Sequence, residues 1–417
     1  MAEQTRSIPI NHDLRPAYYD DFQCLASGCR FTCCKGWKIT FGKKDYLSLK
    51  RQDGSPELNK NMKKTLRRLK KGPMSEQFYG EFDLAGGTCP LQRADGLCLL
   101  QLEKGHEALP YVCRIFPRRE TYWSSGYFER SLSPACEGVL ELLWKLPEGV
   151  DFRSNPLPKQ SRMKTPFYEI GSLHLHFQDI RAQCIDFLQD RRLLLSERIL
   201  LMGLALKKLT DRPEDVEHWI AQAKALGRDP SVVKQVRLSG SESTLSMFLS
   251  NNIKILLKIS APHSDFAAVQ EDLLTGLNIR FQPGTALGTI PFAPYLAAKK
   301  RFDKTFASHS FFMENLMVSL FFHLCLPNCD SGEDLWKSYV SFCNLYSFYR
   351  FMAVMSCREG ASGDKAELFR LMVCASRGLI HNSGRQVQLR DEFFQNDSAT
   401  LAHMAVLLGS CWDEHRP

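Results

Sequence analysis

CLASGCRFTCC, residues 24–34, opens the stretch of sequence that decides how this chain is organised. The stretch ends at Cys136 and holds eight of the fifteen cysteines, while the other seven are spread thinly over the rest of the chain. The eight are Cys24, Cys29, Cys33, Cys34, Cys89, Cys98, Cys113 and Cys136. Thiols at this density indicate a site that binds something.

The length and composition are those of an ordinary protein with room for two domains: 417 residues, 44% hydrophobic and 24% charged. The longest apolar run, 311–326, is interrupted by polar residues and is shorter than the roughly 20 residues that span a bilayer. A buried helix is therefore expected there, and no membrane partner. The N-terminal sequence MAEQTRS has no apolar signal region. We expect a cytoplasmic protein, in which structural disulfides are rare and clustered cysteines indicate metal or redox chemistry.

A metal site in this stretch would be almost entirely thiolate, because His106 is the only histidine between Cys24 and Cys136. All-sulfur coordination is typical of zinc and of iron–sulfur clusters. Zinc sites favour closely paired cysteines, whereas here Cys-x4-Cys-x3-Cys-Cys is followed by single, widely separated thiols. The spacing favours an iron–sulfur cluster of the 4Fe–4S type, with zinc as the alternative. We assign all eight cysteines to the metal site, although Cys33 and Cys34 are adjacent and cannot be equivalent ligands of one ion.

The expected fold class is mainly α. Residues 1–150 are expected to form a Cys-rich metal-binding domain with short hairpins and loops, including a hairpin at 121–132. Residues 151–417 are expected to form an α-helical domain, since apolar residues recur at helical spacing in segments such as 195–209 and 335–353. The boundary is placed in a proline- and lysine-rich linker, Leu146–Pro166.

The segment 43–71 is strongly basic, with eleven Lys or Arg residues against Asp45, Asp53 and Glu57. Its pattern predicts one or two helices broken at Gly54–Pro56. Such a segment is typical of a solvated helix face, or of a surface that binds nucleic acid or an acidic protein.

Two common motif types are missing from the sequence, although a redox-sensing or radical enzyme with a non-standard cysteine arrangement stays an alternative. The Cys-x3-Cys-x2-Cys signature of radical enzymes fails, since position 36 holds glycine where the third cysteine is required. The glycine-rich loops of dinucleotide- and nucleotide-binding folds are also absent from the sequence.

The order of several short motifs resembles the bacterial flagellin lysine-N-methylase family. The motifs are Cys33-Cys34-x-Gly36-Trp37, Cys89-Pro90-Leu91, Leu97-Cys98, Cys113-Arg114-x-Phe116-Pro117-Arg118 and Ser131-Leu-Ser-Pro-Ala-Cys136. The N-terminal part is also similar to a wider group of zinc- or iron-chelating cysteine domains. The run Glu314-Asn315-Leu316-x-Val318 looks like the C-terminal half of the family, so the resemblance covers most of the chain.

The resemblance implies transfer of a methyl group from S-adenosylmethionine to lysine ε-amino groups of flagellin. Only about one lysine in 2,500 is neutral at pH 7, so the enzyme must lower the lysine pKa, for example in a partly apolar channel. Arg114 and Arg118 are the candidate cofactor-binding residues, because they could meet the cofactor carboxylate. Glu314 is the candidate residue that orients or deprotonates the amine, although a carboxylate interacting with a helix N-terminus is the alternative.

Two questions stay open at the level of the sequence. The metal centre either holds the loops of the site in place or offers an open iron position to S-adenosylmethionine, and the structural role is favoured. The alternative function is a non-catalytic iron–sulfur or zinc module that binds nucleic acid or a protein partner through residues 43–71, although the resemblance argues against nucleic acid.

Overall fold

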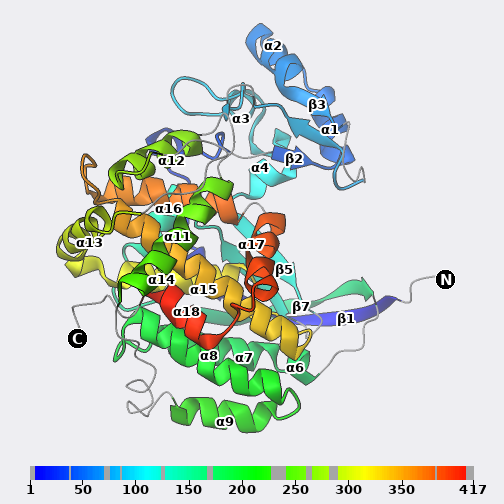
Figure 1. Cartoon of the computed structure of the whole chain (residues 1–417). Coiled ribbons are helices and arrows are strands. Elements are labelled where there is room, and N and C mark those ends of the chain that lie inside the picture. The colour runs from blue at the N-terminus through cyan, green and yellow to red at the C-terminus, as the bar shows by residue number, and fades with distance from the viewer. Residues whose placement is uncertain are drawn as a thin grey trace.

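The computed structural model describes most of the chain and shows a mainly helical protein with two small sheets (Figure 1). The described residues are 5–36, 39–69, 76–84, 87–123, 127–166, 172–226, 241–259, 265–280, 290–380 and 383–409.

A four-stranded sheet joins the beginning of the chain to the segment before the helices. Its order is β5-β6-β1-β7, and the strands are β1 (Thr5–Pro16), β5 (Arg118–Tyr122), β6 (Tyr127–Leu132) and β7 (Phe152–Pro166). β5 and β6 pair antiparallel, which confirms the hairpin predicted at 121–132. Most of the linker predicted at 146–166 forms β7, which pairs along nearly its whole length with β1, while the domain boundary placed there stays a prediction. β7 is an edge strand, where prolines without an N–H donor are tolerated.

A small lobe, residues 39–115, has its own core and sheet. Its strands are β2 (Ile39–Phe41), β4 (Gly80–Phe82) and β3 (Leu66–Arg68), in the order β2-β4-β3. Its helices are α1 (Lys43–Lys50), α2 (Pro56–Thr65), α3 (Leu99–Lys104) and α4 (Tyr111–Ile115). The predicted break between two basic helices is confirmed, since Ser55 caps α2 by accepting from the Leu58 N–H and Pro56 occupies the first turn.

The rest of the chain is a helical body around one large core. It comprises α5 (Glu137–Leu143), α6 (Ser172–Leu175), α7 (Phe177–Leu188), α8 (Leu195–Asp211), α9 (Val216–Leu226), α11 (Glu242–Ile259), α12 (Asp265–Gly276), α13 (Ala293–Thr305), α14 (Phe311–His323), α15 (Gly332–Met355), α16 (Lys365–Leu379), α17 (Ser383–Gln395) and α18 (Leu401–Leu408). The stripes predicted at 195–209 and 335–353 fall on α8 and α15 and are confirmed as core.

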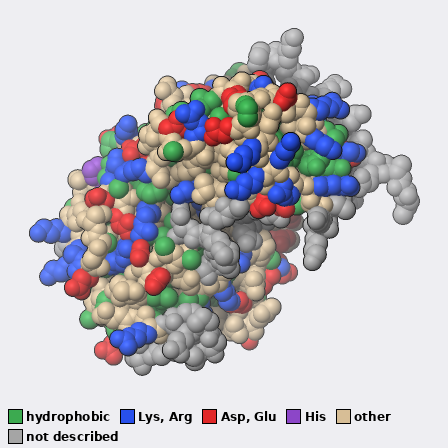
Figure 2. Space-filling model, turned by 90° about the horizontal axis from the view of Figure 1, so that it is seen from above, with side chains coloured by type: hydrophobic (Ala, Val, Ile, Leu, Met, Phe, Trp, Pro, Cys, Tyr) green, Lys and Arg blue, Asp and Glu red, His purple; other side chains and the backbone are tan. Residues whose placement is uncertain are grey.

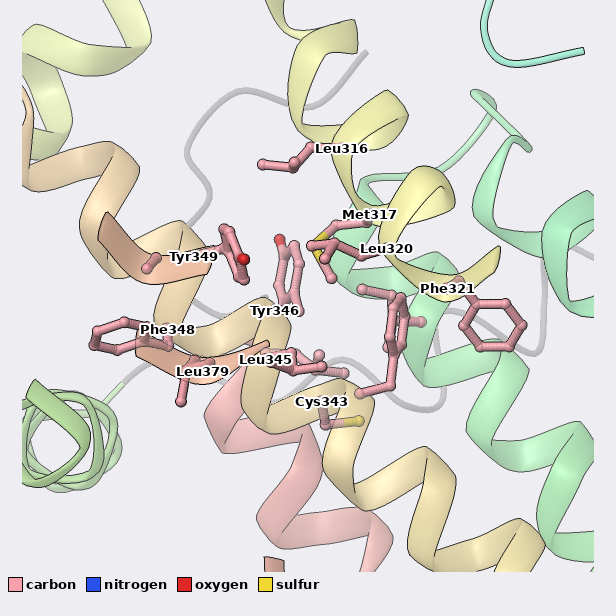
Figure 3. Packing of buried hydrophobic residues seen from close by; sticks show 14 of the residues in the cluster. Leu316, Met317, Leu320, Phe321, Cys343, Leu345, Tyr346, Phe348, Tyr349 and Leu379 are labelled. Carbon is pink, nitrogen blue, oxygen red and sulfur yellow. The ribbon is translucent and has the colours of Figure 1, made fainter. Parts of the chain in front are cut away.

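Helices α14 and α15 are buried on nearly every side and form the centre of this body. Figure 3 shows Met317, Leu320 and Phe321 of α14 pointing toward the side chains of α15. The rings of Phe321 and Phe342 meet edge to face at 5.0 Å. The predicted buried helix at 311–326 is thus confirmed, with its end at His323. In the part of the chain that the structure describes, no helix combines the length and the apolar composition that crossing a membrane requires.

Candidate functional site

A cavity of about 540 Å³ lies where the small lobe meets the helical body. One wall comes from α4 and β5, and the other from the end of α14, the following loop, α15 and α17. The lining residues are Val112, Ile115, Phe116, Pro117, Arg118, Arg119, Ser133, His323, Leu324, Leu326, Asn328, Asp334, Ser338, Ser341, Leu345, Ile380, Gln386, Val387 and Arg390. Its volume is within the range of small-molecule and cofactor sites.

The short helix α4 separates this cavity from a second hollow. Val112 and Ile115 line the large cavity, whereas Tyr111 and Arg114 line a polar hollow of about 390 Å³ beside α1. Residues three apart lie on one side of a helix, and a shift of one residue turns the side by about 100°, so the two pairs face different ways. Cys113, between them in sequence, packs against the core of the small lobe.

Cationic side chains outnumber carboxylates on the cavity wall. Arg118 places its guanidinium over the rings of Phe22, at 5.0 Å, and Tyr19, at 5.9 Å, and forms no ion pair with a described residue. Arg119 donates to the backbone oxygen of His323 at 2.7 Å. Asp334 is the one carboxylate among the described lining residues. The cavity therefore suits an organic ligand that carries a negative group.

The two arginines predicted to bind the cofactor, Arg118 and Arg114, line different hollows. Arg118 lines the large cavity, where it can meet a ligand. Arg114 faces the small hollow instead, donates to Glu107 at 3.0 Å and lies over the ring of Tyr111. The two arginines therefore cannot hold the same small molecule.

Glu314 lies outside the lining of both hollows and is fully engaged in the helical body. It is 3% exposed at the start of α14. Arg191 donates to it at 2.8 Å and Arg198 at 2.6 Å. This buried carboxylate, which accepts from two guanidinium groups, fixes the segment after α7 and the starts of α8 and α14 against one another. Its predicted contact with the amine stays a prediction.

Four of the eight clustered cysteines form one group, in which Cys33, Cys89 and Cys98 lie near Cys113. Burial, followed by the charges of Cys33, Cys89 and Cys98, raises the pKa of the Cys113 thiol well above its usual value. The loops that carry these thiols are joined by main-chain bonds, since Cys89 N–H donates to Cys34 O at 2.8 Å and Lys35 bridges to Thr88. The group comes from three separate parts of the sequence.

The remaining thiols adjoin this group through Cys33. Burial raises the pKa of Cys136 to about 11, and the charges of Cys33 and Cys24 add to the shift. Burial likewise raises the pKa of Cys29 to about 12, with further contributions from Glu137 and Cys136. The eight cysteines therefore occupy one region, as a common metal site requires.

Their arrangement is not that of a metal site, although their chemistry is. Within the described ranges, no three His, Cys, Asp or Glu side chains are placed so that they could hold a metal ion. None of the fourteen cysteines in those ranges forms a disulfide. The ligand assignment therefore stays a prediction. Of the other cysteines, Cys184, Cys329, Cys343 and Cys357 are buried, Cys325 and Cys374 are partly buried, and Cys411 lies outside the described residues.

Two charged residues of the helical body hold the first cysteine loop in place. Glu137, 1% exposed at the start of α5, accepts from the backbone N–H groups of Arg30 and Phe31 at 2.6 and 3.1 Å. Arg377 of α16 donates to the backbone oxygens of Phe31 and Lys35 at 2.6 and 3.2 Å. Ile380, three residues after Arg377, lines the large cavity. The C-terminal end of α16 therefore contacts both the cysteine loop and the wall of the large cavity.

No sequence pattern points to Arg377, Asp334 or Arg390. Arg377 binds main-chain oxygens, which any sequence provides, and Asp334 and Arg390 reach the cavity from helices far apart in the chain. Ser331-x-x-Asp334 is recognisable as a helix start, because Ser331 accepts from the Asp334 N–H, but this pattern does not predict a ligand site.

Comparison with known proteins identifies relatives of the helical body. Residues 181–407 match the family model described as the FliB lysine N-methylase C-terminal domain. The chain is 33% identical over 166 residues to lysine-N-methylases from Salmonella choleraesuis and Salmonella typhimurium, and the match spans 37% of the chain and 37% of each relative. It is 35% identical over 148 residues to the flagellar biosynthetic protein FliU of Salmonella muenchen, which covers 32% of the chain and 78% of that protein.

No solved structure matches the chain. The matched range 181–407 contains the α14, α15 and α17 side of the cavity, whereas α4, β5 and the eight clustered cysteines lie before it.

Proposed function

Because the chain belongs to the FliB lysine N-methylase family, we propose that it transfers a methyl group from S-adenosylmethionine to lysine ε-amino groups of flagellin. The relatives that share the family are named lysine-N-methylases, and one is named a flagellar biosynthetic protein. Those names support lysine methylation as the reaction and the flagellar system as the setting. The proposed location is the cytoplasm.

The observation that carries this proposal is the large cavity with Arg118 on its wall, whose guanidinium has no ion-pair partner among the described residues. S-adenosylmethionine has a carboxylate, an ammonium group and a sulfonium centre. In this proposal Arg118 binds the carboxylate with help from Arg119, and Asp334 binds the ammonium group; the support is that all three line the cavity. Carboxylate–guanidinium bonds are among the stronger polar contacts in proteins.

The reaction requires a neutral amine and a dry site. The lysine nitrogen attacks the methyl carbon, the bond between carbon and sulfur breaks, and the sulfonium becomes a neutral thioether. The amine must lose a proton before the attack, which the apolar side chains of the wall promote by disfavouring the charged lysine. Phe116, Leu324, Leu326 and Leu345 supply this apolar surface.

The eight cysteines are proposed as ligands of an iron–sulfur cluster, with zinc as the alternative, in a structural role. The proposal is supported by two features: the eight cysteines lie in one region of the structure, and they come from separate parts of the sequence. A metal centre there would fasten the loops at 24–36 and 87–98 to α4, which forms one wall of the cavity. All-thiolate donors suit such a centre. Methyl transfer itself needs only the neutral amine and the sulfonium.

Incubation of the protein with flagellin and methyl-labelled S-adenosylmethionine tests the proposed function. The expected result is label on lysine residues, located by mass spectrometry of the digested flagellin. A matched reaction with flagellin whose lysines have been acetylated should incorporate no label. Absence of label from a folded preparation with its metal content intact would refute the proposal.

A further inference from the structure

A strongly basic surface covers the small lobe on the side away from the helical body. Figure 2 shows Lys and Arg side chains gathered on the face where Figure 1 places α1, α2 and β3. The basic surface consists of the exposed residues Lys44, Lys50, Arg51, Lys60, Lys63, Lys64, Arg67 and Arg68. Its five lysines and Arg51 form no ion pair with any residue in the described ranges.

The geometry of α2 concentrates this charge on one side. Leu58, Met62 and Thr65 are its buried residues. Lys60, Lys63 and Lys64 are exposed and lie three and four positions apart, so they share the opposite side. Like charges at this spacing destabilise a helix. Lys63 and Lys64 lie in the last turn, where the helix dipole favours cations, but the dipole does not favour Lys60 beside them. Binding of a negative partner would account for all three.

A path leads from the basic surface to the large cavity. Lys44 belongs to the basic surface and also lines the small hollow, whose far side is formed by Tyr111 and Arg114 of α4. A different side of α4, with Val112 and Ile115, lines the large cavity. A chain that crosses the hollow therefore needs to pass only one short helix to reach the cavity.

The composition of the surface favours a protein over a nucleic acid. Phe78 is 51% exposed and Leu47 is 38% exposed beside the basic residues, and apolar anchors with a charged rim are typical of protein interfaces. Tyr79, in contrast, is covered by Lys43 and Arg68, which leaves its faces unavailable for stacking on bases.

We propose that the basic surface docks an acidic stretch of the protein substrate, so that a lysine near that stretch crosses α4 into the large cavity. This inference rests on the proposed function and adds to it the part of the substrate that is recognised. The enzyme then selects lysines by the acidic surface beside them, and long-range attraction speeds encounter with the substrate.

Charge reversal on α2 tests the docking surface. The variant carries Lys60→Glu, Lys63→Glu and Lys64→Glu. The matched control carries Lys208→Glu, Arg212→Glu and Lys224→Glu, exposed positions on α8, directly after α8 and on α9, the helices that lie at the opposite end of the molecule in Figure 1. Binding of fluorescent flagellin is measured by anisotropy, separately from methyl transfer, which is measured with whole flagellin and with a short uncharged peptide containing one lysine.

The α2 variant is expected to lose about 10-fold or more in flagellin affinity and in kcat/KM at low salt. The loss should shrink near 1 M salt, where the Debye length is about 3 Å. Activity on the short peptide and the behaviour of the control variant should be unchanged. Equal losses in both variants, or loss of activity on the peptide, would overturn the proposal.

Two further outcomes distinguish failure of the proposed function from failure of the docking proposal. If wild-type protein binds flagellin through the lysines but transfers no methyl group, the docking surface stands and the proposed function fails. If the α2 variant loses binding to a labelled single-stranded oligonucleotide while flagellin binding is retained, the surface belongs to nucleic acid and the proposal is wrong.

Discussion

At the scale of single residues, the distinction that matters most is between Arg118 and Arg114. The two lie in the same motif, Cys113-Arg114-x-Phe116-Pro117-Arg118, and the resemblance predicts that both bind the cofactor. Arg118 reaches the large cavity without a carboxylate partner among the described residues, whereas Arg114 is paired with Glu107 in the small hollow. We therefore expect Arg118, but not Arg114, to contact a ligand in the large cavity.

Replacing Arg118 with methionine should weaken binding of S-adenosylmethionine by about 10- to 100-fold, since a hydrogen bond to a charged group contributes roughly 1.5–3 kcal/mol. Methionine keeps much of the side-chain length over Phe22. Isothermal titration calorimetry measures the affinity. Arg114→Met is the matched control and should bind normally. Equal affinities for both variants would show that Arg118 does not hold the cofactor.

Replacing Glu314 with glutamine separates its structural role from the predicted chemical one. The change removes the buried charge that faces Arg191 and Arg198, so the free energy of unfolding should fall by about 3–5 kcal/mol. Chemical denaturation measures this loss. The fraction that remains folded should keep its kcat. A large fall in kcat with unchanged stability would instead support a role for Glu314 in orienting or deprotonating the amine.

At the scale of elements, the helix α16 connects the cysteine loop with the cavity. Arg377 donates to backbone oxygens of residues 31 and 35, and Ile380 continues into the cavity wall. Glu137 at the start of α5 holds the N–H groups of the same loop. Helix α16 thus supplies the hydrogen-bond donor and α5 supplies the acceptor, and the cysteine loop is bound to both.

Arg377→Ala should release the loop, because two main-chain oxygens lose their donor, at about 1–3 kcal/mol for each buried group left unpaired. Hydrogen exchange followed by mass spectrometry should show faster exchange over residues 31–36. Arg370→Ala, on the same helix but paired with Glu367 and Asp272, is the control and should leave this segment protected. Unchanged exchange in the Arg377 variant would contradict the supporting role.

Metal content tests the division of the cysteines into two sets. Cys33→Ser and Cys113→Ser, both in the clustered region, should abolish bound metal if a shared centre exists there. Cys374→Ser, on α16, should leave the metal content unchanged. Elemental analysis of the purified variants gives the answer, and absorption near 400 nm in the wild type would favour iron–sulfur over zinc. The same loss in all three variants would contradict the division.

At the scale of the whole molecule, the large cavity depends on two parts with separate cores. The small lobe supplies α4, and the helical body supplies α14, α15 and α17 (Figure 1). A ligand in the cavity would touch both parts and thereby fasten one to the other. Binding should therefore be visible as stabilisation far beyond the residues in contact.

S-adenosylmethionine at 100 times its Kd should stabilise the folded protein by about 2.7 kcal/mol. The rise in Tm is measured by differential scanning calorimetry, and hydrogen exchange should slow in both walls, at 112–119 and at 323–328. The Arg118→Met variant should show neither effect at the same concentration. Protection confined to one wall would mean that the ligand does not lie between the two parts.

The sequence by itself determined the local elements and the chemistry of the thiols. Periodic apolar residues at 195–209 and 335–353 specified α8 and α15, and Ser55–Pro56 specified the start of α2, because helix periodicity and capping act within a few residues. The order of the cysteine motifs sufficed for the family resemblance, which the match over 181–407 confirms. The division of the chain near residue 150 stays a prediction.

Only the tertiary structure decided which of these residues meet. It formed strand β7 from residues 152–166 of the expected linker, placed Arg114 and Arg118 in different hollows, and surrounded Glu314 with arginines. It also brought Arg377 to the cysteine loop and Asp334 and Arg390 to the cavity. Glu314 lies 123 positions from Arg191 and 116 from Arg198, and Arg377 lies 346 positions from Phe31. No local pattern encodes such contacts, because packing and edge pairing of the whole chain set their distances.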